Sequence, residues 1–192
     1  FSRDGYLKKM TDRVLRKATT LKYKDGDEPF IEFDSSNTHD LLVFTNQCQV
    51  YKCKVAAFED TKSAQLGSYL PTDLEMDADE TVTWVIDPED YKADVLFVFE
   101  NGRVARVTLS GYATKTNRKR LKNAIYGGSK LMYATVLKEE RDLALVSSDF
   151  RLVNFNTSLL KTKTTNSTQG VQALTIKGSR TVTMVGTAEE FI

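Results

Sequence analysis

The stretch VLFVFENGRVARVTL, residues Val95–Leu109, predicts a β-hairpin. An apolar strand leads into an Asn-Gly turn, and the returning strand carries Arg103 and Arg106. Asn-Gly between two apolar segments is a strong hairpin signal, because both residues tolerate the positive φ that a tight turn requires. Since the two arginines flank the turn, we expect their long stems to carry both charged heads into water.

The hairpin pattern recurs along the chain. Related segments are LLVFTNQCQVYKCKV (Leu41–Val55), LALVSSDFRLVNFNT (Leu143–Thr157) and FSRDGYLKKM (Phe1–Met10), the last matching only the second half of a hairpin. The first apolar residues after the turns are Leu7, Val50, Val104 and Leu152, at separations of 43, 54 and 48 residues. A period of this size is typical of propeller blades, although the Trp-Asp and Gly-His signatures of common propellers are missing.

Further strand-like segments follow each hairpin. They are Thr81–Ile86, Lys130–Leu137 and Thr181–Gly186, with Gln65–Leu70 and Thr168–Leu174 at equivalent places in their copies. Long helical periodicity is absent, and the linker Pro88–Tyr91 has room for at most one turn of helix. We therefore predict repeated units of about four short strands.

The first strand of each hairpin is apolar without alternation, as in DVLFVF (Asp94–Phe99). Such a strand has to be covered on both faces, which happens when small sheets stack around an axis as propeller blades do. The sequence thus predicts an all-β fold of about four four-stranded blades, in a single domain spanning residues 1–192. The expected repeats are residues 1–36, 37–90, 91–139 and 140–192. Trp84, the single tryptophan, is expected in the core.

Bulk composition fits one folded domain or an array of small units, with 192 residues of which 41% are hydrophobic. The odd separation of Cys48 and Cys53 places them on opposite faces of one predicted strand, where they can neither form a disulfide nor share a metal ion. Free thiols, no signal peptide and no apolar run of about 20 residues predict a cytoplasmic protein without membrane contact. Because the chain begins just inside a strand, we expect a piece of a longer protein.

The 27 basic and 26 acidic side chains nearly cancel, but they are sorted into blocks. Residues 103–138 contain nine basic residues and no acidic one, and residues 3–24 contain eight basic and two acidic residues. Residues 59–94 contain eleven acidic and two basic residues. Each block alone is typical of a solvated loop, but the bases recur after each hairpin turn and in the following loop. On stacked blades they would line one perimeter, a track for a phosphate backbone.

The candidate DNA-contacting residues come from these blocks. They are Lys8, Lys9, Arg13, Arg16, Lys17, Lys22, Lys52, Lys54, Arg103, Arg106, Lys115, Arg118, Lys119, Arg120, Lys122 and Arg151. Hydroxyl and amide groups within YATKTNRKRLKN (Tyr112–Asn123) can donate to phosphate oxygens and position a duplex without reading its sequence.

The segments RDGYLKK, HDLLVFTNQCQVYKCKV and QLGSYLPTDLEMDADETV resemble the C-terminal repeat domain of the A subunit of bacterial type IIA topoisomerases, DNA gyrase and topoisomerase IV. The resemblance is clearest over Gly5–Val85 and weaker beyond Val136. It implies a β-pinwheel that binds and bends or wraps double-stranded DNA around a basic rim and presents it to the catalytic core of the same polypeptide. It also implies an ATP-dependent parent enzyme with an ATPase B subunit, whereas this fragment is expected to be non-catalytic and without a cofactor.

The resemblance has one departure. Gyrase A subunits carry a Gln-Arg-Arg-Gly-Gly-rich box, and the corresponding segment here, DRVLRKATTLKYKDGD (Asp12–Asp27), keeps basic residues but lacks that string. Glycines allow a backbone to approach phosphates closely, so their loss argues against tight chiral wrapping. A topoisomerase IV or a divergent gyrase is therefore favoured.

Catalytic and metal-binding motifs are weak. His39 is the single histidine, which excludes a multi-histidine metal site, and we expect it in the loop that enters a strand. YGGSK (Tyr126–Lys130) lacks phosphate-loop spacing and predicts a tight turn, while DLEMDADE (Asp73–Glu80) lacks the turn glycine of an EF-hand and predicts a solvated acidic loop. The alternative to a DNA-binding domain is a β-propeller that binds an acidic protein partner.

Overall fold

The computed structural model describes residues 1–115 and 120–191, and it is built almost entirely from four antiparallel sheets. The sheets contain, in spatial order, β1 (Tyr6–Leu7) and β4 (Ser68–Tyr69); β5 (Val82–Ile86), β2 (Asp40–Thr45), β3 (Val50–Lys54) and β8 (Arg120–Leu121); β12 (Val171–Gln172), β7 (Arg103–Thr108), β6 (Asp94–Phe99) and β9 (Leu131–Leu137); and β11 (Leu152–Asn156), β10 (Asp142–Ser147) and β13 (Val182–Gly186). The predicted all-β class is confirmed.

The quoted hairpin forms as predicted, because β6 and β7 pair from Val95–Val107 to Val98–Val104 around Gly102. Gly102 has a φ of +83°, the conformation that the Asn-Gly turn needs. The equivalent turn residues of the other two hairpins are Cys48 and Phe150, which adopt φ values of 57° and 60° despite their side chains. The prediction that both cysteines share one strand is therefore wrong, since Cys48 lies in the turn before β3; both thiols are free and half-buried.

The outer strand of three sheets comes from a later part of the chain. β4, β8 and β12, each two residues long, pair with β1, β3 and β7, the strands that begin at or near the residue after each turn. The predicted segments Gln65–Leu70 and Thr168–Leu174 contain β4 and β12 at equivalent places, while β8 has no counterpart among the predicted strands. Within the described residues, β11 has no partner on its outer edge.

The core alternates with the sheets. Leu42 and Phe44 of β2 face the cluster shared with the sheet of β6, while Leu41 and Val43 face the cluster shared with the N-terminal segment. The opposite face of β6, with Leu96 and Val98, packs on the sheet of β10. The central strands are thus covered on both faces, as their continuous apolar pattern predicts, and each fully buried Leu or Phe contributes about 1.5 to 3 kcal/mol.

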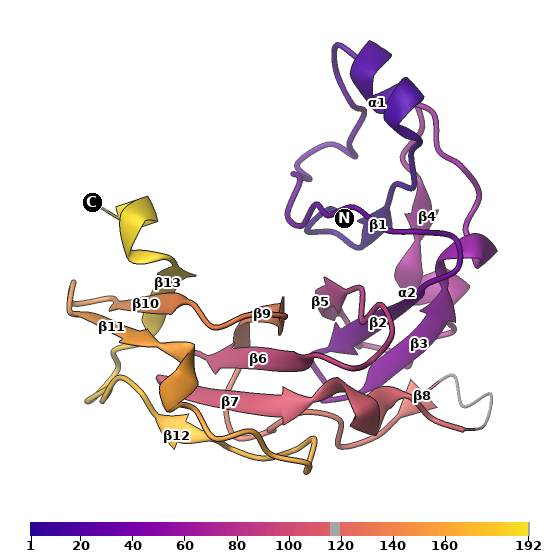
Figure 1. Ribbon diagram of the computed structural model, residues 1–192. Coiled ribbons are helices and arrows are strands. Elements are labelled where there is room, and N and C mark those ends of the chain that lie inside the picture. Colours follow the sequence, from indigo (N-terminus) through magenta and orange to yellow (C-terminus); the bar gives the residue numbers. More distant parts are fainter. Residues whose placement is uncertain (116–119, 192) are drawn as a thin grey trace.

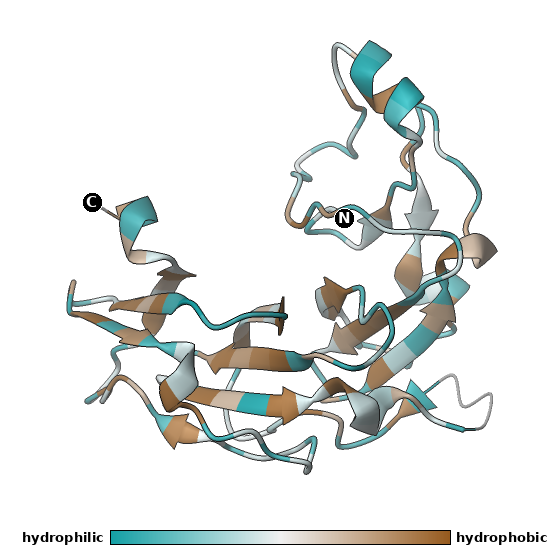
Figure 2. Ribbon diagram, in the orientation of Figure 1, coloured by the Kyte–Doolittle hydropathy of each residue, from teal (hydrophilic) through white to brown (hydrophobic). Residues whose placement is uncertain are grey.

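The sheets follow one another along an arc (Figure 1), with β5 and β9 on its inner side and β8 and β12 along its outer border. The N-terminal segment and the C-terminal turn η4 (Ala188–Phe191) lie at the two ends of this arc. Figure 2 shows that hydrophobic colour concentrates in the central strands, whereas the loops and most of α1 are hydrophilic. The arc therefore places polar loops along the outer edges of successive sheets.

Two short helices, α1 (Asp12–Lys17) and α2 (Leu70–Asp73), were not expected from the periodicity. Thr11 caps α1 by accepting a hydrogen bond from the backbone N–H of Val14, and no residue of α1 is buried. The remaining helical turns are η1 (Val55–Ala57), η2 (Leu109–Tyr112) and η3 (Thr157–Leu159), one after each hairpin. In the described part of the chain, no helix is long and apolar enough to cross a membrane.

Candidate nucleic-acid interface

Three of the candidate DNA-contacting residues occupy one strand position, two residues after the first apolar residue that follows the turn. Each is held by a carboxylate and is largely buried, with side-chain exposures of 19%, 22% and 15% for Lys9, Lys52 and Arg106. The ion pairs are Lys9–Asp60 at 3.4 Å, Lys52–Asp40 at 3.9 Å and Arg106–Asp94 at 2.7 Å. The expectation that the Arg106 head reaches water is wrong, because the paired aspartates neutralise this position.

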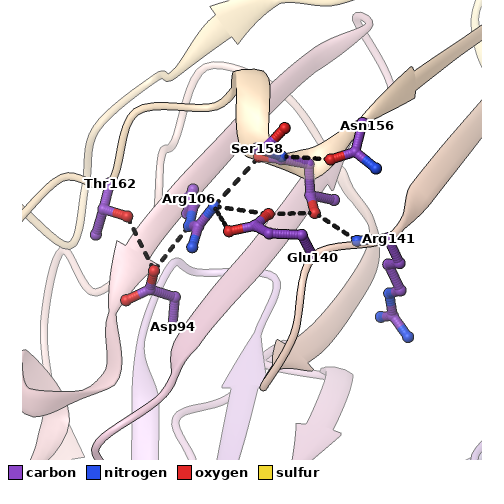
Figure 3. Close-up of polar contacts among 8 residues, drawn as sticks. Asp94, Arg106, Glu140, Arg141, Asn156, Ser158 and Thr162 are labelled. Carbon is purple, nitrogen blue, oxygen red and sulfur yellow. Dashed lines mark hydrogen bonds and ion pairs between the residues drawn. The ribbon is translucent and has the colours of Figure 1, made fainter.

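Arg106 joins two sheets (Figure 3). Its Nε donates to Asp94 at 2.7 Å and its Nη1 donates to Glu140 at 2.8 Å and to the carbonyl of Thr157 at 3.2 Å. Thr162 adds a hydrogen bond to Asp94 at 2.9 Å. Burial disfavours the charged guanidinium, but the bonds to the two carboxylates outweigh it and raise the pKa of Arg106. The cluster ties β6 and β7 to the segment that precedes β10.

Asp40 forms the corresponding cluster one sheet earlier. The carboxylate is almost fully buried, pairs with Lys54 at 2.5 Å and accepts a hydrogen bond from the hydroxyl of Tyr91 at 2.5 Å. Burial disfavours its ionisation, but the bonds from Lys54 and Tyr91 outweigh this effect and lower the pKa of Asp40. Because Tyr91 precedes β6, the contact again joins one sheet to the next.

Arg103 and Arg151 follow two hairpin turns at equivalent positions and lie close to one returning segment. Arg103 Nη1 donates to the carbonyl of Gly170 at 3.4 Å, and Arg151 Nη1 donates to the carbonyl of Thr175 at 3.3 Å. Their sheets are neighbours that share a hydrophobic cluster. The structure therefore brings these two predicted residues onto one side of the molecule, at successive outer edges.

Arg120 extends the same border on β8. Its Nη1 donates to Asp77 at 3.1 Å and to the hydroxyl of Tyr51 at 3.4 Å. Hydrogen bonds from Gln49 and then from Arg120 lower the pKa of Asp77. Lys115 and Lys122 are exposed on either side of this strand, while the predicted residues Arg118 and Lys119 lie outside the described residues.

The N-terminal basic block is divided between the core and the surface. Lys8 is half-buried, its Nζ donates to the carbonyl of Gln65, and burial lowers its pKa. The other predicted residues of this block are exposed: Arg13, Arg16 and Lys17 on α1, and Lys22 in the loop that follows. α1 lies at the end of the arc, away from the β8 and β12 edges (Figure 1).

The acidic loop 73–80 is not entirely solvated, contrary to the prediction. Glu80 is buried and accepts hydrogen bonds from the hydroxyls of Thr45 at 2.6 Å and Tyr51 at 2.7 Å, and from the amide of Gln49 at 2.9 Å. Glu80 therefore braces the turn of the β2–β3 hairpin. Among the described residues, no group of three or more His, Cys, Asp or Glu side chains is arranged to hold a metal ion.

His39 lies directly before β2, as predicted for the loop that enters a strand. Its Nδ1 is 2.8 Å from Asp87 Oδ2, which also accepts a hydrogen bond from Ser35 at 2.5 Å. Trp84 packs edge-on against Phe30 and Tyr133 at the rim of the core. These contacts give both residues a structural role.

Sequence reasoning left Lys62 and Lys163 out of the candidate contacts, although both are exposed beside outer strands. The signal that identifies them is a repeated Thr-Lys pair followed by Ser or Thr, found at residues 61–63, 114–116 and 162–164. This motif is short, so its meaning emerges only when the three copies are seen at the same place in the sheets.

Comparison with known proteins gives relatives of one kind. The chain is 28% identical over 124 residues to the A subunit of DNA topoisomerase 4 from Bacillus subtilis, covering 62% of the chain, and 24% identical over 189 residues to its counterpart from Staphylococcus aureus, covering 95%. It spans only 15% and 23% of the length of these two curated relatives. No protein-family model matches the chain.

Solved structures agree with this likeness. The C-terminal domain of DNA topoisomerase IV superposes with a TM-score of 0.78 at 22% identity, covering 96% of this chain and 58% of that one. The E. coli ParC C-terminal domain superposes with a TM-score of 0.71 at 17% identity, covering 96% of this chain and 76% of that one. These comparisons confirm the resemblance stated from the sequence: the chain is similar, over nearly its whole length, to the C-terminal domain of the A subunit of bacterial type IIA topoisomerases.

Proposed function

We propose that this chain is a non-catalytic DNA-binding domain that binds and bends duplex DNA along the outer edges of its sheets. The observation that carries the proposal is the placement of Arg103 and Arg151 at equivalent positions in neighbouring sheets, with Arg120, Lys115 and Lys122 on the preceding edge. Such a border attracts phosphates by Coulomb forces and counterion release, without reading base sequence.

The finer architecture belongs to the same proposal. The chain is one β-pinwheel with repeats at residues 1–36, 37–90, 91–139 and 140–192, in which each outer strand crosses into the sheet of the preceding repeat. The solved structures with this fold are C-terminal domains of topoisomerase IV and gyrase A, which supports the assignment.

The parent protein that we propose is the A subunit of an ATP-dependent type IIA topoisomerase, in which this domain delivers DNA to the catalytic core and works with an ATPase B subunit. The named relatives, topoisomerase IV A subunits, support this parent. The segment that lacks the glycine-rich box forms α1 and an irregular loop, so binding without strong chiral wrapping is the expected mode.

Two measurements test the proposal. At about 0.15 M salt, we expect the domain to retain a duplex of arbitrary sequence, with affinity that falls steeply as salt rises. Closed circular DNA saturated with the domain, relaxed and deproteinised, should keep its linking number, since chiral wrapping is not expected. Failure to retain duplex DNA, together with binding to a polyglutamate column, would contradict the proposal and favour the module that binds an acidic protein.

A further inference from the structure

Three Thr-Lys segments lie at one place in the fold. They run beside the outer hairpin strand, at the position held by Lys9, Lys52 and Arg106. The contacts are Thr61 N to the carbonyl of Lys9 at 2.6 Å, Lys52 Nζ to the carbonyl of Thr114 at 3.5 Å, and Lys163 N to the carbonyl of Arg106 at 2.8 Å. Because the anchoring position is the same in three consecutive sheets, the lysines of these segments recur once per sheet along the outer border.

Within each segment the two side chains differ in burial. Thr61 is buried, and the half-buried Thr162 donates to Asp94 at 2.9 Å. Lys62, Lys115 and Lys163 are exposed, and their side chains form no hydrogen bond or ion pair with the described part of the chain. The inner basic residue at each position is neutralised by a carboxylate, so the exposed lysine is the cation left for a ligand.

The surroundings of these lysines favour a polyanion that also accepts hydrogen bonds. Residues 161–170 contain no acidic side chain and carry exposed hydroxyls at Thr164, Thr165 and Ser167. Ser63 provides a hydroxyl beside Lys62, and the acid nearest in sequence, Asp60, is paired with Lys9. Lysine ammonium groups with hydroxyl donors are typical contacts to the phosphates of DNA, which position a duplex without specifying its sequence.

We propose that Lys62, Lys115 and Lys163 form one repeated set of phosphate contacts, a single lysine from each of three consecutive sheets, to the backbone of duplex DNA. The inference rests on the proposed function and adds the residues that make its contacts at regular intervals. Equivalent placement means that the three lysines contribute equally, whereas α1 and its cations lie outside the repeated set.

The test is the salt dependence of duplex binding by the whole chain carrying Lys62→Gln, Lys115→Gln and Lys163→Gln, singly and together. Each phosphate contact contributes about 0.9 to the slope of log K against log salt, so the triple variant should lose about 2 to 3 units and each single variant about 1 unit. The matched control carries Lys92→Gln, Lys130→Gln and Lys177→Gln, three exposed lysines that precede first or inner strands. It removes the same charge and should change the slope by less than about 1 unit.

The outcomes separate this inference from the function beneath it. Equal slopes for the triple variant and its control, with the unchanged chain still binding DNA, would overturn the repeated set alone. An unchanged chain that does not retain duplex DNA would overturn the proposed function itself. Equal losses on polyglutamate and on DNA would reveal a general anion surface and would also overturn the assignment to a duplex. Thermal unfolding of every variant checks that these exposed substitutions leave the fold intact.

Discussion

Arg106 and Arg151 both lie on the returning side of a hairpin, but only Arg106 is enclosed by carboxylates. Arg106→Gln removes the bonds to Asp94 and Glu140 and leaves Asp94 without its guanidinium, so we expect the free energy of unfolding to fall by about 2 to 3 kcal/mol. Arg151→Gln, at an exposed side chain, should change it by no more than about 0.5 kcal/mol. Urea unfolding followed by circular dichroism measures both, and equal losses would contradict the structural role of Arg106.

The Asp40 carboxylate gives the fold a sensitivity to acid. Its pKa is lowered in the folded state, so its stabilising contribution is fully present above its unfolded pKa of about 3.9 and is lost as pH falls through the lower folded pKa. Asp40→Asn should lower the free energy of unfolding by about 1 to 3 kcal/mol near neutral pH, and the gap between the two proteins should narrow below about pH 4. A gap that stays constant from neutral pH to well below that value would show that the ionised carboxylate is not the stabilising species.

At the scale of an element, the two-residue outer strands depend on close backbone contact. Gly170 and Gly178 have φ values of +64° and +63°, but a Cβ on Gly170 would lie 2.0 Å from the carbonyl oxygen of Val104, whereas a Cβ on Gly178 would meet nothing within 4 Å. Alanine at either position carries the same backbone strain of about 1 kcal/mol. We expect Gly170→Ala to cost about 2 kcal/mol more than Gly178→Ala, because it pushes β12 off β7. Thermal unfolding of the two variants measures that difference, and equal losses would mean that β12 does not need the close approach.

The long strands were predictable because burial on both faces leaves an unbroken apolar segment. Asp94–Phe99 was predicted and forms at those residues. Two-residue strands such as β8 carry no period of their own, and their partner lies far away in the sequence. The turn residues Cys48 and Phe150 were hidden for a different reason, since their positive φ is imposed by the hairpin rather than chosen by the residue type.

The candidate interface was only partly predictable. Repetition of basic residues identifies the border, and Arg103 and Arg151 do lie close to one segment. Repetition does not reveal which cation is neutralised, because Glu140 and Asp94 reach Arg106 only after the sheets have packed. The charge sum of a segment therefore says less about its free cations than the strand position of each residue.

For the whole molecule, the unpaired edge of β11 is the most exposed apolar feature of the described residues. Phe150 and Leu152 are 88% and 51% exposed there, and an open strand edge favours pairing with another chain. Leu152→Lys should reduce self-association at high concentration in sedimentation velocity experiments, since charge on an edge strand opposes pairing. Leu15→Lys, on the exposed helix α1, is the control, because Leu15 is 42% exposed but far from this edge. An equal reduction by both variants would point to general solubility instead.

The borrowed outer strands also set an order for biosynthesis. Val104 of β7 finds its partner only in Val171, so a ribosome that has just released β7 has not yet made the residue that closes its edge. At about 5 to 20 residues per second, that wait lasts on the order of several seconds. Each sheet of the nascent polypeptide therefore stays unfinished until its successor emerges, and a translational pause within residues 110–170 would prolong the time during which a chaperone can hold it.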